Sequence, residues 1–394
     1  MRLIRNAWIL GLALMLPPVA IAGGDEIPNP LDDPGTFPIA VWLQAPANAE
    51  KYRSIGINTY VGLWRGPTEE QLDALDAAGM RLICGQNERS LRFRDRATII
   101  GWMHGDEPDN AQALPGGGGY GPPIAPQAIV DQYRAIKEAD PGRPVLLNLG
   151  QGVAWDGWRG RGVRTNHPED YPEYVEGCDI ASFDIYPACH EHPDVAGNLW
   201  YVPRGVERLR RWTEDRKPVW SCIETTRINN AEYSPSPGDT RVEVWMALIH
   251  GARGIIYFCH QFEPRFIEAG LLADDAMSRE VAALNRQIQE LAPVLHSPER
   301  PELARVSSAN DDVPVAVSVR EHDGATYLFA VSMRDGDTTA SFTLPDAGDV
   351  RVEVLGEDRT LDAPEGTWDD RFEGYQVHLY RITPARSSPD DEAS

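Results

Sequence analysis

Short runs of apolar residues recur along the chain at intervals of a few tens of residues. Each run is rich in Val, Ile or aromatic side chains, the composition of a buried β-strand. Eight such segments follow one another: "PIAVWLQ" (38–44), "INTYVGLW" (57–64), "MRLICGQ" (80–86), "IIGWMHGDEP" (99–108), "PVLLNLGQG" (144–152), "DIASFDIYP" (179–187), "PVWSCIETT" (218–226) and "ARGIIYFCHQF" (252–262).

Amphipathic stretches lie between these strand segments. "TEEQLDALDAAGM" begins with a Thr in the capping-box pattern and closes with Gly79, so it predicts a helix with both ends marked. Apolar residues at helical spacing also occur in "PQAIVDQYRAIKEAD", "PRGVERLRRWTEDR" and "TRVEVWMALIHGA". Strands and helices that alternate eight times over about 250 residues are what a (β/α)8 TIM barrel requires, and we predict that fold.

The pattern changes after the segment "SREVAALNRQIQELAPVL", which predicts one last barrel helix ending before Pro298. Alternating apolar residues then flank a turn at Asp323-Gly324, the pattern of a β-hairpin. Further strands are predicted at "TASFTLP", "VRVEVLG" and "GYQVHLYRI", so a small antiparallel β-sandwich follows the barrel. The predicted division is a signal peptide (1–22), a linker (23–36), the barrel (37–297), the β-sandwich (304–383) and a disordered acidic tail (384–394).

The first residues have the order of a secretory signal peptide. Arg2 and Arg5 precede an apolar run over 7–16, and small residues follow at 20–22. The run is too short to span a membrane as a helix, and Pro17 and Pro18 disfavour the alternative of an uncleaved anchor. We therefore expect a secreted or periplasmic protein with no membrane attachment after cleavage.

Composition and charge narrow the range of partners. The chain has 394 residues, of which 42% are hydrophobic and 25% charged, so it has enough apolar residues for a large core. Loss of Arg2 and Arg5, with no acidic residue, changes the formal net charge from -23 to -25. Such a surface repels nucleic acid, whereas it is compatible with a neutral poly- or oligosaccharide. The oligomeric state is left open.

The five cysteines are scattered and show no CxxC spacing for zinc or redox chemistry. Most are expected to be small buried apolar residues. One disulfide is compatible with export, and Cys222 with Cys259 is one conceivable pair.

Acidic residues stand where the predicted barrel strands end. Asp106 and Glu107 finish the fourth strand segment, and Glu224 finishes the seventh. Barrel enzymes carry their catalytic groups at the carboxyl ends of strands. Two carboxyl groups facing each other there suit glycosidic bond cleavage, in which one protonates the leaving oxygen and the other attacks the anomeric carbon. Crowding by other carboxylates raises the pKa of the acid toward working pH.

The motifs "DEP" (106–108) and "IET" (223–225) resemble those of the clan A glycoside hydrolases, which are retaining (β/α)8 enzymes. The resemblance covers about residues 37–296 and implies that Glu107 is the acid/base and Glu224 the nucleophile. Asp106 stands where the clan has an Asn that holds the 2-hydroxyl of the sugar. An Asp accepts a hydrogen bond but offers no amide donor, and it adds charge beside Glu107.

Two alternatives therefore stay open beside a retaining glycosidase. One is an inverting enzyme with Glu107 as acid and Asp184 or Asp106 as base. The other is a catalytically silent barrel that binds carbohydrate.

Other strand ends supply candidate sugar contacts. Tyr186 resembles the clan's aromatic residue near the nucleophile, and Asp184 faces the same side two residues earlier. The remaining candidates carry hydrogen-bonding or stacking groups: Gln44, Trp64, Gln86, Asn148, His260 and Gln261.

Two loops call for separate interpretation. "PGGGGYGPP" (115–123) lacks the GK[ST] of a phosphate loop; it is either a flexible active-site loop carrying Tyr120 or a plain linker. "CHEHPD" (189–194) has ligand-like spacing, but the interpretation as a surface loop is favoured over a metal site. No metal and no other cofactor is predicted.

Overall fold

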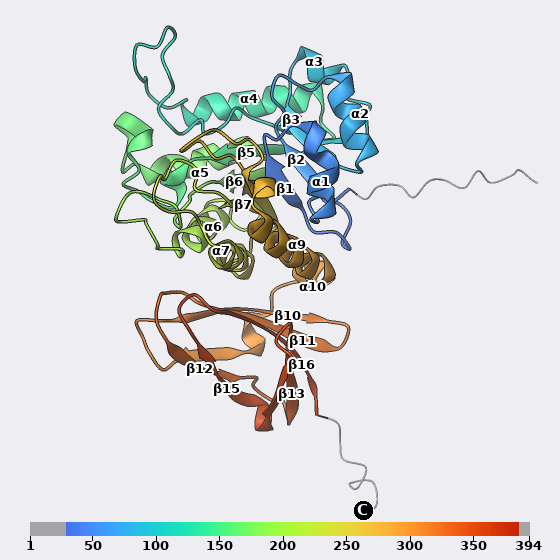
Figure 1. The fold of residues 1–394 in the computed structure, drawn as a ribbon, viewed down its shortest axis with the longest axis vertical. Helices are drawn as coiled ribbons and strands as arrows, with labels where there is room; N and C mark the ends of the chain where they lie inside the picture. The colour runs from blue at the N-terminus through green and yellow to red at the C-terminus, as the bar shows by residue number, and fades with distance from the viewer. Residues whose placement is uncertain (1–28, 386–394) are drawn as a thin grey trace, which may run out of the picture.

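The computed structural model describes residues 29–385, and the predicted signal peptide and most of the acidic tail lie outside them. Eight parallel strands pair in sequence order and close into a barrel, which confirms the predicted fold. Figure 1 shows this barrel, with its helices around it, above a separate β domain. The barrel strands are β1 (Ile39–Trp42), β2 (Thr59–Val61), β3 (Arg81–Gly85), β4 (Ile99–Met103), β5 (Val145–Leu149), β6 (Ile180–Phe183), β7 (Val219–Glu224) and β8 (Gly254–Phe258).

Helices connect the barrel strands and cover their outer faces. They are α1 (Ala49–Ser54), α2 (Glu69–Ala77), α3 (Glu88–Leu91), α4 (Pro126–Ala139), α5 (Tyr171–Tyr174), α6 (Tyr201–Trp212), α7 (Pro237–Ile249), α8 (Gly270–Ala273), α9 (Asp275–Glu290) and α10 (Ala292–His296). Short 3-10 helices occur at Pro46–Asn48, Gln151–Val153, Arg159–Arg164, Pro168–Asp170, Val175–Gly177, Pro301–Leu303 and Pro364–Gly366.

Local sequence explains the ends of several helices. At the start of α2, Thr68 Oγ1 accepts from the Gln71 backbone N–H, and the Thr68 N–H donates to Gln71 Oε1. This capping box satisfies two groups that a helix start leaves unpaired. The predicted single last helix is instead two, α9 and α10, with the break at Leu291. Pro293 explains the difference, because a proline has no N–H to continue the helical hydrogen bonds.

The barrel strands are buried on both faces. Side chains such as Trp220, Cys222 and Ile256 fill the barrel interior. Neighbours on the other face, such as Val219, Ile223 and Ile255, pack in the layer between the strands and the helices. Alternate residues of one strand therefore enter two different cores, as the two-residue period of a strand requires.

The β domain is a two-sheet sandwich, as predicted. One sheet has the order β10-β11-β16-β13-β14 and the other β15-β12-β9. Their bounds are β9 (Arg305–Ser308), β10 (Val315–His322), β11 (Ala325–Ser332), β12 (Thr338–Thr343), β13 (Val350–Val354), β14 (Arg359–Ala363), β15 (Thr367–Phe372) and β16 (Val377–Pro384). The predicted hairpin joins β10 to β11, and both Asp323 and Gly324 have the positive φ of a two-residue hairpin turn.

An apolar contact joins the two domains. The ring of Trp245 on α7 lies 5.4 Å from that of Phe329 on β11, and both side chains are buried. Val331 and Leu379 belong to the same continuous core as the barrel helices. The sandwich therefore buries part of its outer surface against the barrel.

Cys222 and Cys259, the pair considered for a disulfide, are not bonded to each other. Both are free and buried, with Cys222 in the barrel interior and Cys259 in the core outside the strands. All five cysteines are buried, as expected of small apolar residues. Among residues 29–385 no helix is both long enough and apolar enough to cross a membrane.

Candidate active site

Glu107 lies four residues beyond the end of β4, in a strained backbone conformation. Its φ is +43°, in the left-handed region that costs a residue with a side chain on the order of 1 kcal/mol or more. The Glu107 N–H donates to the carbonyl of Asn148 on β5 at 3.2 Å. Strain of this kind persists where the surrounding structure fixes it, which is common at functional sites.

Gly150 leaves the space in which the Glu107 carboxyl lies. A Cβ at position 150 would lie 2.8 Å from Glu107 Oε1 and 2.9 Å from the side-chain amide of Asn110. Real Cβ atoms essentially never approach other atoms this closely. The loop after β5 therefore helps to set the position of the Glu107 side chain.

Asn148 connects the acids at the ends of β4 and β6. Its Nδ2 donates to Asp106 Oδ1 at 2.9 Å and to Asp184 Oδ2 at 3.1 Å. Its Oδ1 accepts from the Ser182 hydroxyl at 2.8 Å. The amide thus places a hydrogen-bond donor between two carboxyl groups that would otherwise repel each other.

Asp106, Glu107 and Asp184 form an acidic cluster, and the pKa of each of the three carboxyl groups is raised. Burial, followed by the charges of Asp106 and Asp109, raises the pKa of Glu107 to about 7. Burial, followed by the charges of Glu107 and Asp106, raises the pKa of Asp184 well above its ordinary value. Asp184 also shares a hydrogen bond with Glu107, which requires a proton on one of the two carboxyls.

Asp106 belongs to the same cluster: the residue as a whole is exposed, but its carboxyl accepts from Asn148 Nδ2 in a partly buried contact. The protein packed around its carboxyl raises the pKa of Asp106 to about 6, against the opposing effect of the hydrogen bond from Asn148. The three groups interact strongly enough that their protons leave stepwise from the cluster as a whole. One proton is therefore available in the cluster near neutral pH.

Asp109 has a different environment. Its Oδ1 accepts from the Gly150 N–H and its Oδ2 from the Tyr171 hydroxyl, both at 2.8 Å. The side chain is fully buried. Asp109 therefore ties the loop after β4 to the segment after β5, and its charge adds to the field at Glu107.

Glu224, the last residue of β7, is fully buried. Its Oε1 accepts from the backbone N–H of Ala188 at 2.6 Å and its Oε2 from that of Cys189 at 2.8 Å. Burial raises its pKa, and these hydrogen bonds act in the opposite direction. Glu107 and Glu224 thus end strands on the same side of the barrel but have separate sets of partners, and their action as a catalytic pair stays a prediction.

The other predicted contact residues fall into two groups. Tyr186 lies near the acidic cluster, with its ring 5.1 Å from that of Phe258, and its pKa is raised by burial and by Asp184. Trp64 is 69% exposed on the loop after β2. These two, together with Asp106, Asp184 and Asn148, are at or near the mouth of the barrel.

Gln44, another predicted contact, has partners within the protein. It is 1% exposed; its Nε2 donates to the carbonyls of Trp42 and Glu268, and its Oε1 accepts from the Tyr52 hydroxyl. His260 Nε2 lies 3.3 Å from the same Gln44 amide. Gln44 therefore links the ends of β1 and β8, both of its N–H groups are used within the protein, and its role as a sugar contact stays a prediction.

The two remaining glutamines bond to nearby backbone. Gln86 Nε2 donates to the carbonyl of Ile136 on α4 at 3.1 Å, so its amide turns toward the helix layer. Gln261 Nε2 donates to the Arg265 carbonyl at 3.5 Å, and its backbone pairs with Ile267. Both contacts stabilise loops.

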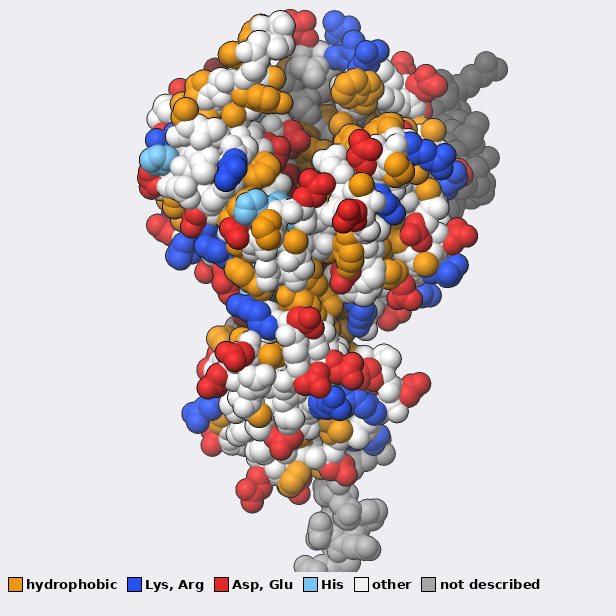
Figure 2. Space-filling model, turned by 60° about the vertical axis from the view of Figure 1, so that its left-hand side comes forward, with side chains coloured by type: hydrophobic (Ala, Val, Ile, Leu, Met, Phe, Trp, Pro, Cys, Tyr) orange, Lys and Arg blue, Asp and Glu red, His pale blue; other side chains and the backbone are white. Residues whose placement is uncertain are grey.

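Exposed aromatic side chains lie on the loops that follow the strands. They come from the loops after β2, β4, β7 and β8: Trp64, Tyr120, Tyr233, Phe262 and Phe266. Figure 2 shows acidic side chains in a recess of the barrel half, with hydrophobic side chains beside it. Acids within and aromatic rings around them are suited to the hydroxyls and the apolar faces of sugars.

The Gly-rich loop projects from the barrel between β4 and α4, in teal at the upper left of Figure 1. Ala113 and Tyr120 pair across it, and Tyr120 is 77% exposed. The histidines of the 189–194 loop are occupied locally, since His190 Nε2 contacts Gln151 Oε1 and His190 Nδ1 accepts from the His192 N–H. No cluster of three potential metal ligands occurs within residues 29–385.

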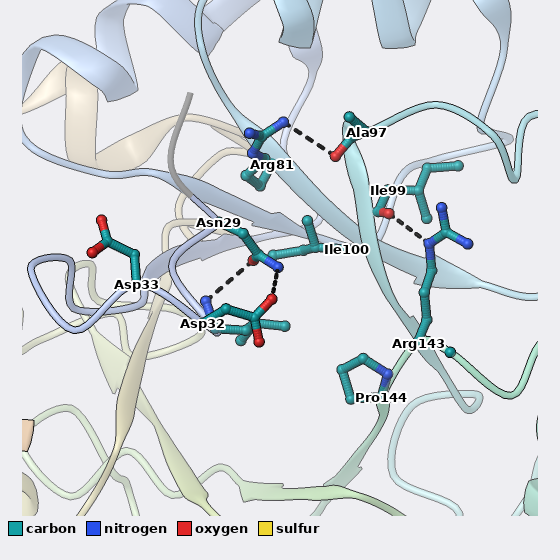
Figure 3. A pocket seen from close by; sticks show the side chains of 11 residues that line it. Asn29, Asp32, Asp33, Arg81, Ala97, Ile99, Ile100, Arg143 and Pro144 are labelled. Atoms are coloured by element: carbon teal, nitrogen blue, oxygen red, sulfur yellow. Dashed lines mark hydrogen bonds between the residues drawn. The ribbon is translucent and has the colours of Figure 1, made fainter. Parts of the chain in front are cut away.

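A cavity of about 750 Å³ lies at the opposite end of the barrel. Figure 3 shows its lining. Arg81 donates to the carbonyl of Ala97, just before β4, and Arg143 donates to the carbonyl of Ile99, the first residue of β4. A second cavity, of about 650 Å³, lies beside Ala188 and includes Tyr233 and Tyr375. Because barrel chemistry occurs at the carboxyl ends of strands, the first cavity is not the candidate site.

Sequence reasoning did not identify Glu243, Asn110 or Gly150 as part of this region. Glu243, on α7, is fully buried and interacts with Glu224. A signal was present, because Glu243 is the one charged residue in the apolar run "VEVWMALI" (242–249). A lone acid on a buried helix face indicates a specific partner.

Comparisons with known proteins match part of the barrel. A family profile described as beta-galactosidase, glycoside hydrolase family 42, matches residues 126–293, which include Glu224. The Beta-galactosidase of Thermus thermophilus is 31% identical over 147 residues, 32% of this chain and 22% of that protein. Beta-galactosidase BgaA of a Thermus species is 30% identical over 152 residues, with the same coverage. The chain thus spans about a fifth of the length of these curated relatives.

Solved structures show the same fold. A maltogenic alpha-amylase, AmyB, from Thermotoga neapolitana has a TM-score of 0.55 at 8% identity, covering 89% of this chain and 99% of its own. Alpha-galactosidase I from Mortierella vinacea has a TM-score of 0.53 at 11% identity, covering 90% and 98%. At these identities the likeness shows the fold alone. The predicted resemblance to the clan A glycoside hydrolases is confirmed by the family profile, because residues 126–293 are similar to family 42, the beta-galactosidases.

Proposed function

We propose that this protein is a retaining glycoside hydrolase in which Glu107 is the acid/base and Glu224 the nucleophile. The observation that carries the proposal is the Glu107 carboxyl, which lies at the mouth of the barrel with a pKa of about 7. A group with that pKa holds a proton for the leaving oxygen at neutral pH and, once deprotonated, accepts one from water. Glu224 would attack the anomeric carbon and form the glycosyl-enzyme.

The proposed attack requires one rearrangement. Both oxygens of Glu224 are held by the backbone of residues 188–189, so this segment must release the carboxylate when a sugar is bound. The segment lies in the stretch between β6 and α6, which contains no helix or strand. Its displacement therefore breaks two hydrogen bonds to Glu224 and leaves the barrel sheet intact.

The contacts of Glu107 count against the inverting alternative. An inverting pair needs its carboxyl groups roughly 6.5 to 9.5 Å apart, so that a water fits between them. Asp184 instead shares a hydrogen bond directly with Glu107. Asp106 is the neighbouring residue in the chain and belongs to the same hydrogen-bonded cluster.

Substrates for the first tests follow from the comparisons. The matched relatives are named as beta-galactosidases, so aryl β-galactosides are the first probes, followed by aryl glycosides of other sugars. Glu107→Gln should lose activity most strongly on substrates with poor leaving groups, because an activated leaving group needs no proton. Added azide should then restore turnover by replacing water as the second nucleophile. Glu224→Gln should abolish hydrolysis of every substrate.

One observation favours a second candidate, a silent carbohydrate-binding barrel. Glu224 is fully enclosed and has both oxygens occupied, and Asp106 replaces the clan's Asn. Saccharide binding measured by titration calorimetry, with no hydrolysis of any glycoside by the unaltered protein, would establish this function. A glycosyl group trapped on Glu224 by a slow-reacting fluorosugar would exclude it.

Export is also a proposal. The order of basic, apolar and small residues over 1–22 supports it. Expression of the full chain in a bacterial host, followed by N-terminal sequencing of the periplasmic product, should give a protein that begins at Gly23. A product that begins at Met1 and stays in the cytoplasm would contradict export.

A further inference from the structure

Glu243 is a carboxyl group buried without a hydrogen-bond donor. It lies on α7 between Val242 and Val244 and is 0% exposed. Neither of its oxygens has a hydrogen-bond partner among groups that ordinarily donate. A charged carboxylate in such a place would be strongly destabilising, so the group must be neutral or must itself donate.

The charged and titratable groups that face Glu243 include no positively charged side chain. They are Glu224 on β7, Asp239 on its own helix, Tyr233 in the loop between β7 and α7, and Cys189 in the loop after β6. Burial and the charge of Glu224 hold the pKa of Glu243 well above its ordinary value. Two carboxylates beside each other only accept hydrogen bonds, so contact between Glu243 and Glu224 becomes a hydrogen bond when one of them carries a proton.

The other partners of Glu224 determine which carboxyl keeps the negative charge. Glu224 accepts from the Ala188 and Cys189 N–H groups, and the Cys189 thiol also donates to it. Donors stabilise a carboxylate, and the Ala188 N–H, which bonds to Glu224 at 2.6 Å, is the one backbone donor that also acts on Glu243, as the weakest of the effects on its pKa. The proton of the pair therefore belongs on Glu243 and the charge on Glu224.

We propose that Glu243 is a positioning residue, which carries a proton and donates a hydrogen bond to Glu224, fixing the orientation of the nucleophile. This inference rests on the proposed function, in which Glu224 attacks the sugar. A donor behind the nucleophile also assists the second half of the reaction. When water releases the sugar, Glu224 leaves as a carboxylate, and the hydrogen bond from Glu243 stabilises that charge.

The test compares two substitutions of similar size. Gln keeps an N–H donor toward Glu224, whereas Leu has none. Glu243→Leu should lower kcat/KM for aryl β-galactosides about 10- to 100-fold, the ratio expected for a lost hydrogen bond to a charged group. It should also move the acidic limb of the pH profile, which reports the ionisation of Glu224. Glu243→Gln should stay within about threefold of the unaltered protein and keep the limb in place.

Val244→Ala is the matched control, because Val244 is fully buried on the same helix and its side chain has no polar group. It should lower stability without moving the pH profile. If Glu243→Gln moves the limb as far as Glu243→Leu does, or if Leu leaves it in place, Glu243 is only structural and the inference is wrong.

An infrared spectrum keeps the inference testable whatever the activity. The difference spectrum between the unaltered protein and Glu243→Gln at neutral pH should show the loss of one protonated-carboxyl carbonyl band, while the band from the Glu107, Asp184 and Asp106 cluster stays in both proteins. A difference spectrum with no lost carbonyl band would overturn the assignment of the proton to Glu243. Failure of the proposed function has a different signature, which is hydrolysis that survives Glu224→Gln while the infrared band still depends on Glu243.

Discussion

The carboxyl of Glu107 lies against the bare Cα of Gly150, at a distance that leaves no room for a methyl group between them. Glu107, which follows β4, is the side chain proposed to deliver the proton. Its position thus depends on Gly150, a residue without a side chain that follows β5. The backbone of Gly150 itself has a negative φ, so an alanine there meets a steric conflict without backbone strain.

Gly150→Ala should therefore displace the Glu107 carboxyl. We expect kcat to fall roughly 10- to 100-fold, because a misplacement of about 1 Å costs that much in oriented catalysis. The fold should survive, with a loss of about 1 to 3 kcal/mol from overpacking. Gly105→Ala is the control, since a Cβ there meets nothing within 4 Å, and it should keep full activity. Equal activity of the two variants would show that the position of Glu107 does not depend on Gly150.

The pH dependence of activity should follow Glu107. As the proton donor its pKa is about 7, so kcat/KM should fall as pH rises through about 7. Because the charge of Asp106 raises the Glu107 pKa, Asp106→Asn should move this limb to lower pH. Each unit of that move costs about tenfold in rate on the alkaline side. A limb that stays in place in the Asn variant would separate Asp106 from the ionisation of the acid.

Folding stability should depend on the same proton. A carboxyl with a folded pKa of about 7 and an ordinary value of 4.5 binds more protons folded than unfolded in this range. The contribution of Glu107 to the free energy of unfolding is therefore fully present below about pH 4.5, and it is lost as the pH rises through about 7. The melting temperature of Glu107→Gln minus that of the unaltered protein should be a few degrees larger at pH 8 than at pH 5, because only the unaltered protein loses this stability. A constant difference between the two proteins across pH would contradict the raised pKa.

The barrel could be predicted because its signals are local. Each barrel strand is buried on both faces, so each appears in the sequence as a continuous apolar run. Strand order then placed Glu107 and Glu224 at strand ends without further information. Three strands of the sandwich were missed: β9, which has four residues of which three are polar, and β14 and β15 for the opposite reason. The solvent faces of β14 and β15 carry acids such as Asp369, and their apolar positions are interrupted.

The sequence alone does not show which polar groups, far apart along the chain, contact each other in the folded protein. Gln44 has the composition of a sugar contact, yet it bonds to the carbonyl of Glu268, which lies 224 positions away. Glu243 has the position of a core residue on its helix, yet it faces a second acid from the neighbouring strand. Only the packed barrel shows which polar groups are already satisfied and which are left to act.

The contact between barrel and sandwich should contribute strongly to stability. Trp245 packs on Phe329 and is fully buried, so Trp245→Ala should cost about 3 to 5 kcal/mol in chemical denaturation. Trp245→Phe should cost less, because the Trp245 indole N–H has no hydrogen-bond partner to lose. Phe266→Ala is the control, as this ring is 61% exposed, and it should stay within about 0.5 kcal/mol. A small loss for Trp245→Ala would mean that the two domains are held by other contacts.

The enclosure of Glu224 gives the last prediction. Asn230 Nδ2 donates to the Cys189 carbonyl at 2.9 Å and so anchors the segment whose N–H groups hold Glu224. Asn230→Ala also removes the bonds that Asn230 Oδ1 accepts from the Glu232 and Tyr233 N–H groups. If the segment must withdraw before attack, the lost bond to Cys189 should favour the withdrawn state and raise kcat about 2- to 10-fold, the range for one neutral hydrogen bond across to that segment. Asn198→Ala removes a bond to the Asp194 carbonyl in the same loop, away from Glu224, and should leave kcat unchanged. A lower kcat in Asn230→Ala would instead mean that the enclosing segment belongs to the active arrangement.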